Sequence, residues 1–164
     1  MRRIIFAAFA ALLALIQASL FPASGLIGMY PDFVLVFLLV WSAHHGVDEG
    51  LWMAFGLGLW LDVITMERLG THVLTMLPVA VIGSLASWRL LRSGMMLPIL
   101  AVVAATIASA FVDTILTTLG GQMPEPFAAT RLAIATALLN AVIVPFAWGV
   151  TLVIDRWVPR HATT

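Results

Sequence analysis

The amino-acid sequence predicts an all-α integral membrane protein with six transmembrane helices and both termini in the cytoplasm. The composition is the first reason: 62% of the 164 residues are hydrophobic and 10% are charged, whereas soluble domains carry about 25% charged residues. So few charged residues cannot cover a water-soluble core. The second reason is the succession of apolar runs, and the third is the distribution of arginines between the breaks.

Each span is bounded by charge or turn signals. The first follows two arginines and stops at "FPASG", and the second begins after "YP" and ends at "HHGVDEG". The third ends at "ERLGT", the fourth at "RLLRSG" and the fifth at "GGQMPEP", which precedes the sixth. All belong to a single domain, 1–164, because no break could hold a soluble domain. The expected spans are 4–21, 32–45, 50–66, 72–90, 97–119 and 128–154.

The second span is the least certain to cross. Its apolar run, Phe33 to Ala43, gives about 16 Å of helix against a hydrocarbon core of about 30 Å, so a re-entrant segment is the alternative. If the span crosses, six arginines share one side of the membrane against two; otherwise the division is four against four. The positive-inside rule therefore favours six crossings. The six are Arg2, Arg3, Arg89, Arg92, Arg156 and Arg160, and the two are Arg68 and Arg131.

The first span also resembles a secretory signal, with Arg2 and Arg3 before an apolar run and "FPASG" after it. Cleavage there would leave five spans. Because nothing downstream resembles a secreted domain, we expect this segment to remain as the first helix.

Several chemistries are excluded. A formal net charge of zero argues against a nucleic-acid partner. Cysteine is absent, which excludes disulfides and thiolate chemistry. The four histidines are too scattered to predict a metal site. We expect no metal, no cofactor and no catalytic residue.

Small residues recur four apart along three of the expected helices, which places them on one ridge of each helix. Such ridges let helices approach closely within a membrane, so we expect them to pack helices or bind a partner helix. Two ridges end in an aspartate, and this repetition fits either an internal duplication or chance. The ridges are Gly50, Ala54 and Gly58; Ala101, Ala105 and Ser109; and Ala10, Ala14 and Ala18.

Asp62 and Asp113 follow the first two ridges. A charged group in hydrocarbon costs at least about 2.5–3.5 kcal/mol, so we expect both carboxylates to be buried among helices with a partner. Candidate partners on the same side are Arg68, His72 and Arg131, and we expect Arg131, which begins the last helix, to reach inward to pair with Asp62 or Asp113. Gln17 and Asn140 are expected to be interhelical hydrogen-bonding groups. A substrate or proton site is the alternative to a purely structural contact.

The ordered segments "IQASLFP", "PDFVLVFLLVWSAHHG" and "GLWMAFGLGLWLDVITMERLGTHVL" resemble the bacterial rod shape-determining MreD family. The resemblance is specific over residues 16 to 75. One departure is the turn after the second span, usually basic in that family and here acidic at Asp48 and Glu49. The positions that match the family pattern are Pro31, Asp32, Gly50, Gly56, Gly58, Leu61, Asp62, Leu69 and Gly70.

The resemblance implies a non-enzymatic scaffold in the bacterial inner membrane that supports cell elongation and peptidoglycan synthesis. Its implied partner is the single-span protein MreC, with indirect links to the filament protein MreB, a SEDS-type glycan polymerase and a class B penicillin-binding transpeptidase. The implied fold is similar to the six-helix substrate-binding subunits of energy-coupling-factor vitamin transporters.

Two other functions remain open from the residues. A vitamin-type transporter subunit would use the polar groups of the outer half, which include Asp32, Asp62, His72, Asp113 and Arg131. An intramembrane aspartyl peptidase would use Asp62 and Asp113 as acid and base. The motifs of presenilin-like enzymes and of lipoprotein signal peptidases are absent, which disfavours the peptidase. A membrane lipid is a further candidate occupant of the polar outer half.

Overall fold

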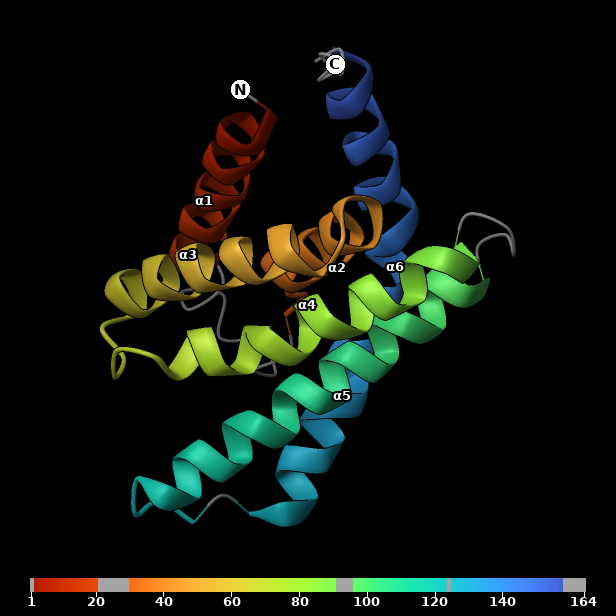
Figure 1. Ribbon diagram of the computed structural model, residues 1–164. Helices are drawn as coiled ribbons and strands as arrows, with labels where there is room; N and C mark the ends of the chain where they lie inside the picture. The colour runs from red at the N-terminus through yellow and green to blue at the C-terminus, as the bar shows by residue number, and fades with distance from the viewer. Residues whose placement is uncertain (1, 21–29, 91–95, 124, 158–164) are drawn as a thin grey trace.

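The structure is a computed structural model that describes residues 2–20, 30–90, 96–123 and 125–157. Within these ranges the chain folds into six α-helices, and each expected span coincides with one of them. The start of α1 and the end of α6 lie at the same end of the molecule (Figure 1). The helices are α1 (Arg2–Leu20), α2 (Phe33–His45), α3 (Val47–Thr65), α4 (Thr71–Leu90), α5 (Met96–Leu119) and α6 (Pro126–Trp157).

Two of these helices are long and apolar enough to cross a membrane on their own. They are α5 and the Pro126–Val153 part of α6. With the overall composition, this identifies an all-helical membrane protein.

The central element is α2, which packs against all five other helices. Each of its residues from Val34 to Ala43 is buried, so the helix shows no polar face. Its 13 residues span about 20 Å. The segment that looked too short to cross is therefore a continuous helix enclosed by protein.

Aromatic side chains hold α1 and α6 to α2. Phe6 of α1 stacks on Trp41 of α2 with ring centroids 4.0 Å apart. Phe37 of α2 meets Phe9 edge-on at 5.3 Å and Phe146 of α6 at 6.4 Å. Because these rings are large and interlock, they fix the positions of α1 and α6 on the central helix.

Glycines set the closest helix approaches. A Cβ on Gly58 of α3 would lie 2.6 Å from backbone atoms of Val73 in α4. A Cβ on Gly83 of α4 would lie 2.6 Å from the Leu39 carbonyl oxygen of α2. The helices α2, α3 and α4 thus approach at distances that only glycine permits at these two positions.

The α5–α6 hairpin leaves the bundle partway along its length. In Figure 1, the portions of α5 and α6 nearest their connection run away from the other helices. The buried residues of α5 are confined to its first half, from Pro98 to Thr106. Beyond that point, apolar side chains such as Phe111 and Ile115 are exposed. In a membrane these faces contact lipid or another protein.

Candidate functional site

Asp62 joins the end of α3 to the beginning of α4. Its carboxylate is 1% exposed and accepts hydrogen bonds from Gly70 N (2.6 Å), His72 N (2.9 Å) and His72 Nδ1 (2.9 Å). Since a carboxylate only accepts, the ring proton lies on Nδ1. The first backbone N–H groups of a helix have no partner within it and carry partial positive charge. Asp62 therefore caps α4 from the neighbouring helix.

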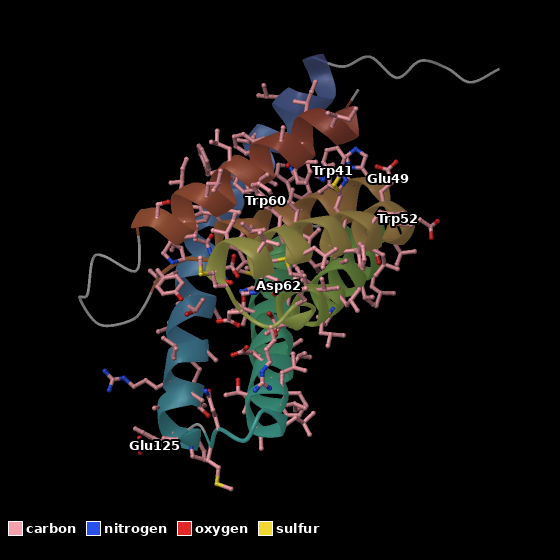
Figure 2. All side chains as sticks on the ribbon, turned by 90° about the vertical axis from the view of Figure 1, so that its left-hand side faces the viewer. Trp41, Glu49, Trp52, Trp60, Asp62 and Glu125 are labelled. Atoms are coloured by element: carbon pink, nitrogen blue, oxygen red, sulfur yellow. The ribbon has the colours of Figure 1, made fainter. Side chains whose placement is uncertain are left out.

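The turn between the two helices is shaped for this contact. It places Met66 (φ 55°) and Gly70 (φ 98°) in left-handed conformations, which reverse the chain within a few residues. Figure 2 shows Asp62 inside the bundle, whereas Glu125 lies at the far end of the α5–α6 hairpin. Of the three candidate partners considered for Asp62, the structure selects His72.

A second set of hydrogen bonds surrounds the N-terminus of α2. Asp32 is the N-cap and accepts from Leu35 N at 3.0 Å. Gln17 of α1 donates to Asp32 Oδ1 at 3.3 Å and accepts from Phe33 N at 3.0 Å. The Asp32 backbone N–H donates to Asn140 Oδ1 of α6 at 2.7 Å. Asn140 Nδ2 donates to Thr106 Oγ1 of α5 at 3.0 Å.

The first set joins α3 to α4, and the second joins α1, α5 and α6 to the start of α2, the helix against which all the others pack. Together the two sets contain one side chain from each of α1, α3, α4, α5 and α6, and also Asp32, which caps α2. We call this group the interhelical polar cluster. In an apolar medium, hydrogen bonds between helices fix how the helices meet. Its members are Gln17, Asp32, Asp62, His72, Thr106 and Asn140.

The expected burial of Asp113 and Arg131 is wrong. Both are exposed, and neither side chain makes a hydrogen bond or ion pair with any residue that the structure describes. The expected ion pair from Asp62 or Asp113 to Arg131 is therefore also wrong. The physical reason is that α5 leaves the bundle before Asp113, and Arg131 precedes the part of α6 that joins the bundle.

Asp113 instead borders an open pocket between the α3–α4 turn and the second half of α5. We call it the turn pocket; its volume is about 370 Å³. Glu67, Arg68 and Gln122 also line it, whereas Asp62 does not. Asp62 is buried and Asp113 is exposed, so the two aspartates occupy different surroundings, which does not favour an aspartyl dyad.

The small-residue ridges pack helices of this chain against one another. A Cβ on Gly50 would lie 2.4 Å from Ser42 Oγ of α2 and 3.4 Å from Ala80 Cβ of α4. The buried members therefore offer no free ridge to a partner helix, which corrects the partner-binding half of the expectation. Ser109 and Ala18 are half-buried. The buried members are Gly50, Ala54, Gly58, Ala101, Ala105, Ala10 and Ala14.

The residues of the family pattern have distinct places. Asp32 caps α2, and Asp62 and Gly70 are bonded to each other. Leu61 is buried, Pro31 is half-buried, and Gly56 and Leu69 are exposed. The bonded pair gives the spacing between Asp62 and Gly70 a structural role, because the left-handed conformation of Gly70 directs its N–H to the carboxylate.

The opposite end of α2 carries two histidines that bond to its own last turn. His44 Nδ1 lies 2.8 Å from Val40 O and His45 Nδ1 lies 3.0 Å from Trp41 O. Among the described residues, no three His, Cys, Asp or Glu side chains are placed to hold one metal ion. Both histidine rings are hydrogen-bonding partners for carbonyl groups in the last turn of α2.

Sequence reasoning missed Thr106. Its hydroxyl also donates to the Val102 carbonyl at 2.8 Å within α5, and a threonine in an apolar run gives no signal of an interhelical bond. A fixed spacing within one helix could not reveal it, because its partner Asn140 lies 34 positions away on α6.

A protein-family model described as "rod shape-determining protein MreD" matches residues 1–152 of this chain. No curated protein and no solved structure gives a significant match.

Proposed function

The chain belongs to the MreD family of rod shape-determining membrane proteins, and from this premise we propose that it is a non-enzymatic scaffold of the bacterial cell-elongation machinery. In this proposal it crosses the inner membrane six times with both termini in the cytoplasm. It binds MreC and thereby supports peptidoglycan synthesis. MreB, a SEDS-type glycan polymerase and a class B penicillin-binding transpeptidase are linked to it indirectly.

The observation that carries the scaffold proposal is the interhelical polar cluster. Its side chains form two sets of hydrogen bonds that also reach helix ends, as in the three bonds that Asp62 accepts. A catalytic carboxylate needs a position from which it reaches a substrate proton. Asp62 is instead buried and engaged in capping α4, so its geometry fits helix positioning.

Three observations support six crossings. The start of α1 and the end of α6 lie at the same end of the molecule, as an even number of crossings requires (Figure 1). If α2 crosses, six arginines lie on the cytoplasmic side against two outside, which is the excess that the positive-inside rule favours. The short helix α2 is surrounded by protein, so its length of about 20 Å does not have to match the bilayer.

The surface for MreC is then formed by exposed apolar side chains. The ridges of α3 and of the first half of α5 are occupied within the chain. The outer faces of α5 and α6 remain free in the described structure, with Phe111 66% and Val142 78% exposed. Association of helices in a membrane depends on close packing of such faces.

The vitamin-transporter alternative would require a polar chamber in the bundle interior. The interior polar groups found here, such as Asn140 and Asp62, are bonded to neighbouring helices. The turn pocket lies at the surface, lined by the α3–α4 turn and the end of α5. These features favour the scaffold over a transporter subunit.

The test is co-purification with MreC after co-expression in a rod-shaped bacterium that lacks its own MreD. We expect mild detergent to retain MreC in near-stoichiometric amounts and the cells to recover rod shape. Replacing Phe111 and Val142 by arginine should reduce MreC retention without loss of folded protein, while Arg131→Gln serves as a surface control. A folded, monodisperse chain that never retains MreC would overturn the proposal.

A further inference from the structure

The turn pocket brings charges of opposite sign to one opening. It lies between the α3–α4 turn, which provides Glu67 and Arg68, and the second half of α5, which provides Asp113 and Thr117. Its volume of about 370 Å³ falls within the range of about 300–1,000 Å³ that is typical of small-molecule sites. The pocket is therefore large enough for a small polar group.

These charges do not neutralise one another. Within the described ranges, no hydrogen bond or ion pair joins Arg68 to Glu67 or Asp113. Three ionisable side chains around one cavity, without pairs among them, leave both a cationic and an anionic partner to be supplied.

The Arg68 guanidinium lies against Gly120, just after the last residue of α5. A Cβ on Gly120 would lie 2.8 Å from Arg68 Nη1, so the guanidinium occupies the position that a side chain at residue 120 would take. The guanidinium thus rests against the end of α5, on the wall of the turn pocket. A guanidinium at a cavity wall is suited to a phosphate oxygen.

The pocket extends from Asp113 past the end of α5 to Gly120 and Gln122, where a membrane-spanning helix reaches the lipid headgroups. Asp113 stands six positions before the last residue of α5, about 9 Å along the helix. With 24 residues, α5 spans about 36 Å, slightly more than a hydrocarbon core of about 30 Å. Met66, which lines the pocket, is 94% exposed, so its apolar side chain is placed to contact acyl chains in a bilayer.

We propose that the turn pocket binds the zwitterionic headgroup of a phosphoethanolamine lipid. Asp113 and Glu67 receive the primary ammonium group, whose three N–H donors suit carboxylates. Arg68 receives the phosphate, and an acyl chain lies against Met66 and Leu116, the apolar residues of the lining. With two carboxylates and one guanidinium, the pocket carries a formal charge of −1, which disfavours anionic headgroups. This inference does not depend on MreC binding.

The experiment compares lipids that differ only in the headgroup. Short-chain phosphatidylethanolamine, phosphatidylcholine and phosphatidylglycerol are titrated into the full-length protein in mild detergent. Binding is followed by native mass spectrometry and by the thermal unfolding midpoint. We expect phosphatidylethanolamine to bind most tightly, since the choline ammonium has no N–H and phosphatidylglycerol has no cation.

Variants locate the site. Asp113→Asn and Arg68→Gln should each weaken phosphatidylethanolamine binding by roughly tenfold, the usual size of a lost charge-assisted hydrogen bond. Arg68→Lys should keep most of the binding, and Arg131→Gln, which lies outside the pocket, should keep all of it. Both weakened variants should fold normally, because their side chains bond to no described residue.

Equal affinity for the three lipids, preference for phosphatidylglycerol, or unchanged binding by both pocket variants would overturn the proposal. Soluble glycerophosphoethanolamine separates the two sources of the headgroup. We expect it to bind far more weakly than the lipid, and equal binding would mean a soluble ligand and would overturn the assignment to lipid.

Discussion

The carboxylate of Asp62 accepts hydrogen bonds from both the backbone N–H and the ring Nδ1–H of His72, each at 2.9 Å. With the bond from Gly70 N, three hydrogen bonds connect the last turn of α3 to the start of α4. All three lie at a buried carboxylate. This contact places a charge deep in an apolar sequence without leaving it unpaired.

We expect Asp62→Ala to lower the free energy of unfolding by about 3 kcal/mol, because it removes three bonds to a charged group and leaves buried N–H groups without an acceptor. Asp113→Ala is the matched control, with an expected change within about 0.5 kcal/mol, since its exposed side chain bonds to no described residue. Thermal or denaturant unfolding in detergent measures both. Similar losses at the two positions would contradict the assigned roles.

The glycines of α3 provide a second comparison. Gly58→Ala should destabilise the protein by about 1–3 kcal/mol, because the new Cβ would meet the Val73 backbone at 2.6 Å and force α3 from α4. Gly56→Ala should be neutral or stabilising by up to about 1 kcal/mol, because a Cβ there meets nothing within 4 Å and alanine favours helix. The unfolding midpoints of the two variants should therefore move apart. A destabilised Gly56→Ala protein would contradict the observed packing.

The sequence predicted the helices but not the different positions of the two aspartates. "LWLDVITMERLG" and "AFVDTILTTLGG" align at Asp62 and Asp113. Asp62 lies nine positions before the first residue of the next helix, so its carboxylate reaches the N-terminus of α4. Asp113 lies thirteen positions before the next helix, on a hairpin that has left the bundle. The spacing of small residues describes one helix alone, so it cannot predict where the neighbouring helix begins or ends.

Asn140 is predicted to be the most sensitive residue of α6. Asn140→Ala should cost about 1–3 kcal/mol, because the Asp32 N–H and the Thr106 hydroxyl both lose their interhelical partner. Thr106→Val keeps the shape and removes one interhelical bond, together with the bond of the hydroxyl to the Val102 carbonyl within α5, so a smaller loss is expected. If the double variant costs less than the sum of the two, the residues are coupled as the structure indicates. Strict additivity would argue against their contact.

The crossing of α2 determines the side on which every later loop lies, and the absence of cysteine makes it directly measurable. Asp48, Glu67 and Gln122 are exposed and lie next to successive helix ends, so each can carry a single introduced cysteine. With six crossings, a membrane-impermeant maleimide added to spheroplasts should label Glu67→Cys and Gln122→Cys, and should label Asp48→Cys only after lysis. If α2 does not cross, this pattern inverts at all three positions. Because the two outcomes are opposite at each residue, one labelling series decides between them, and full labelling of Asp48→Cys in intact spheroplasts would refute the six-helix topology.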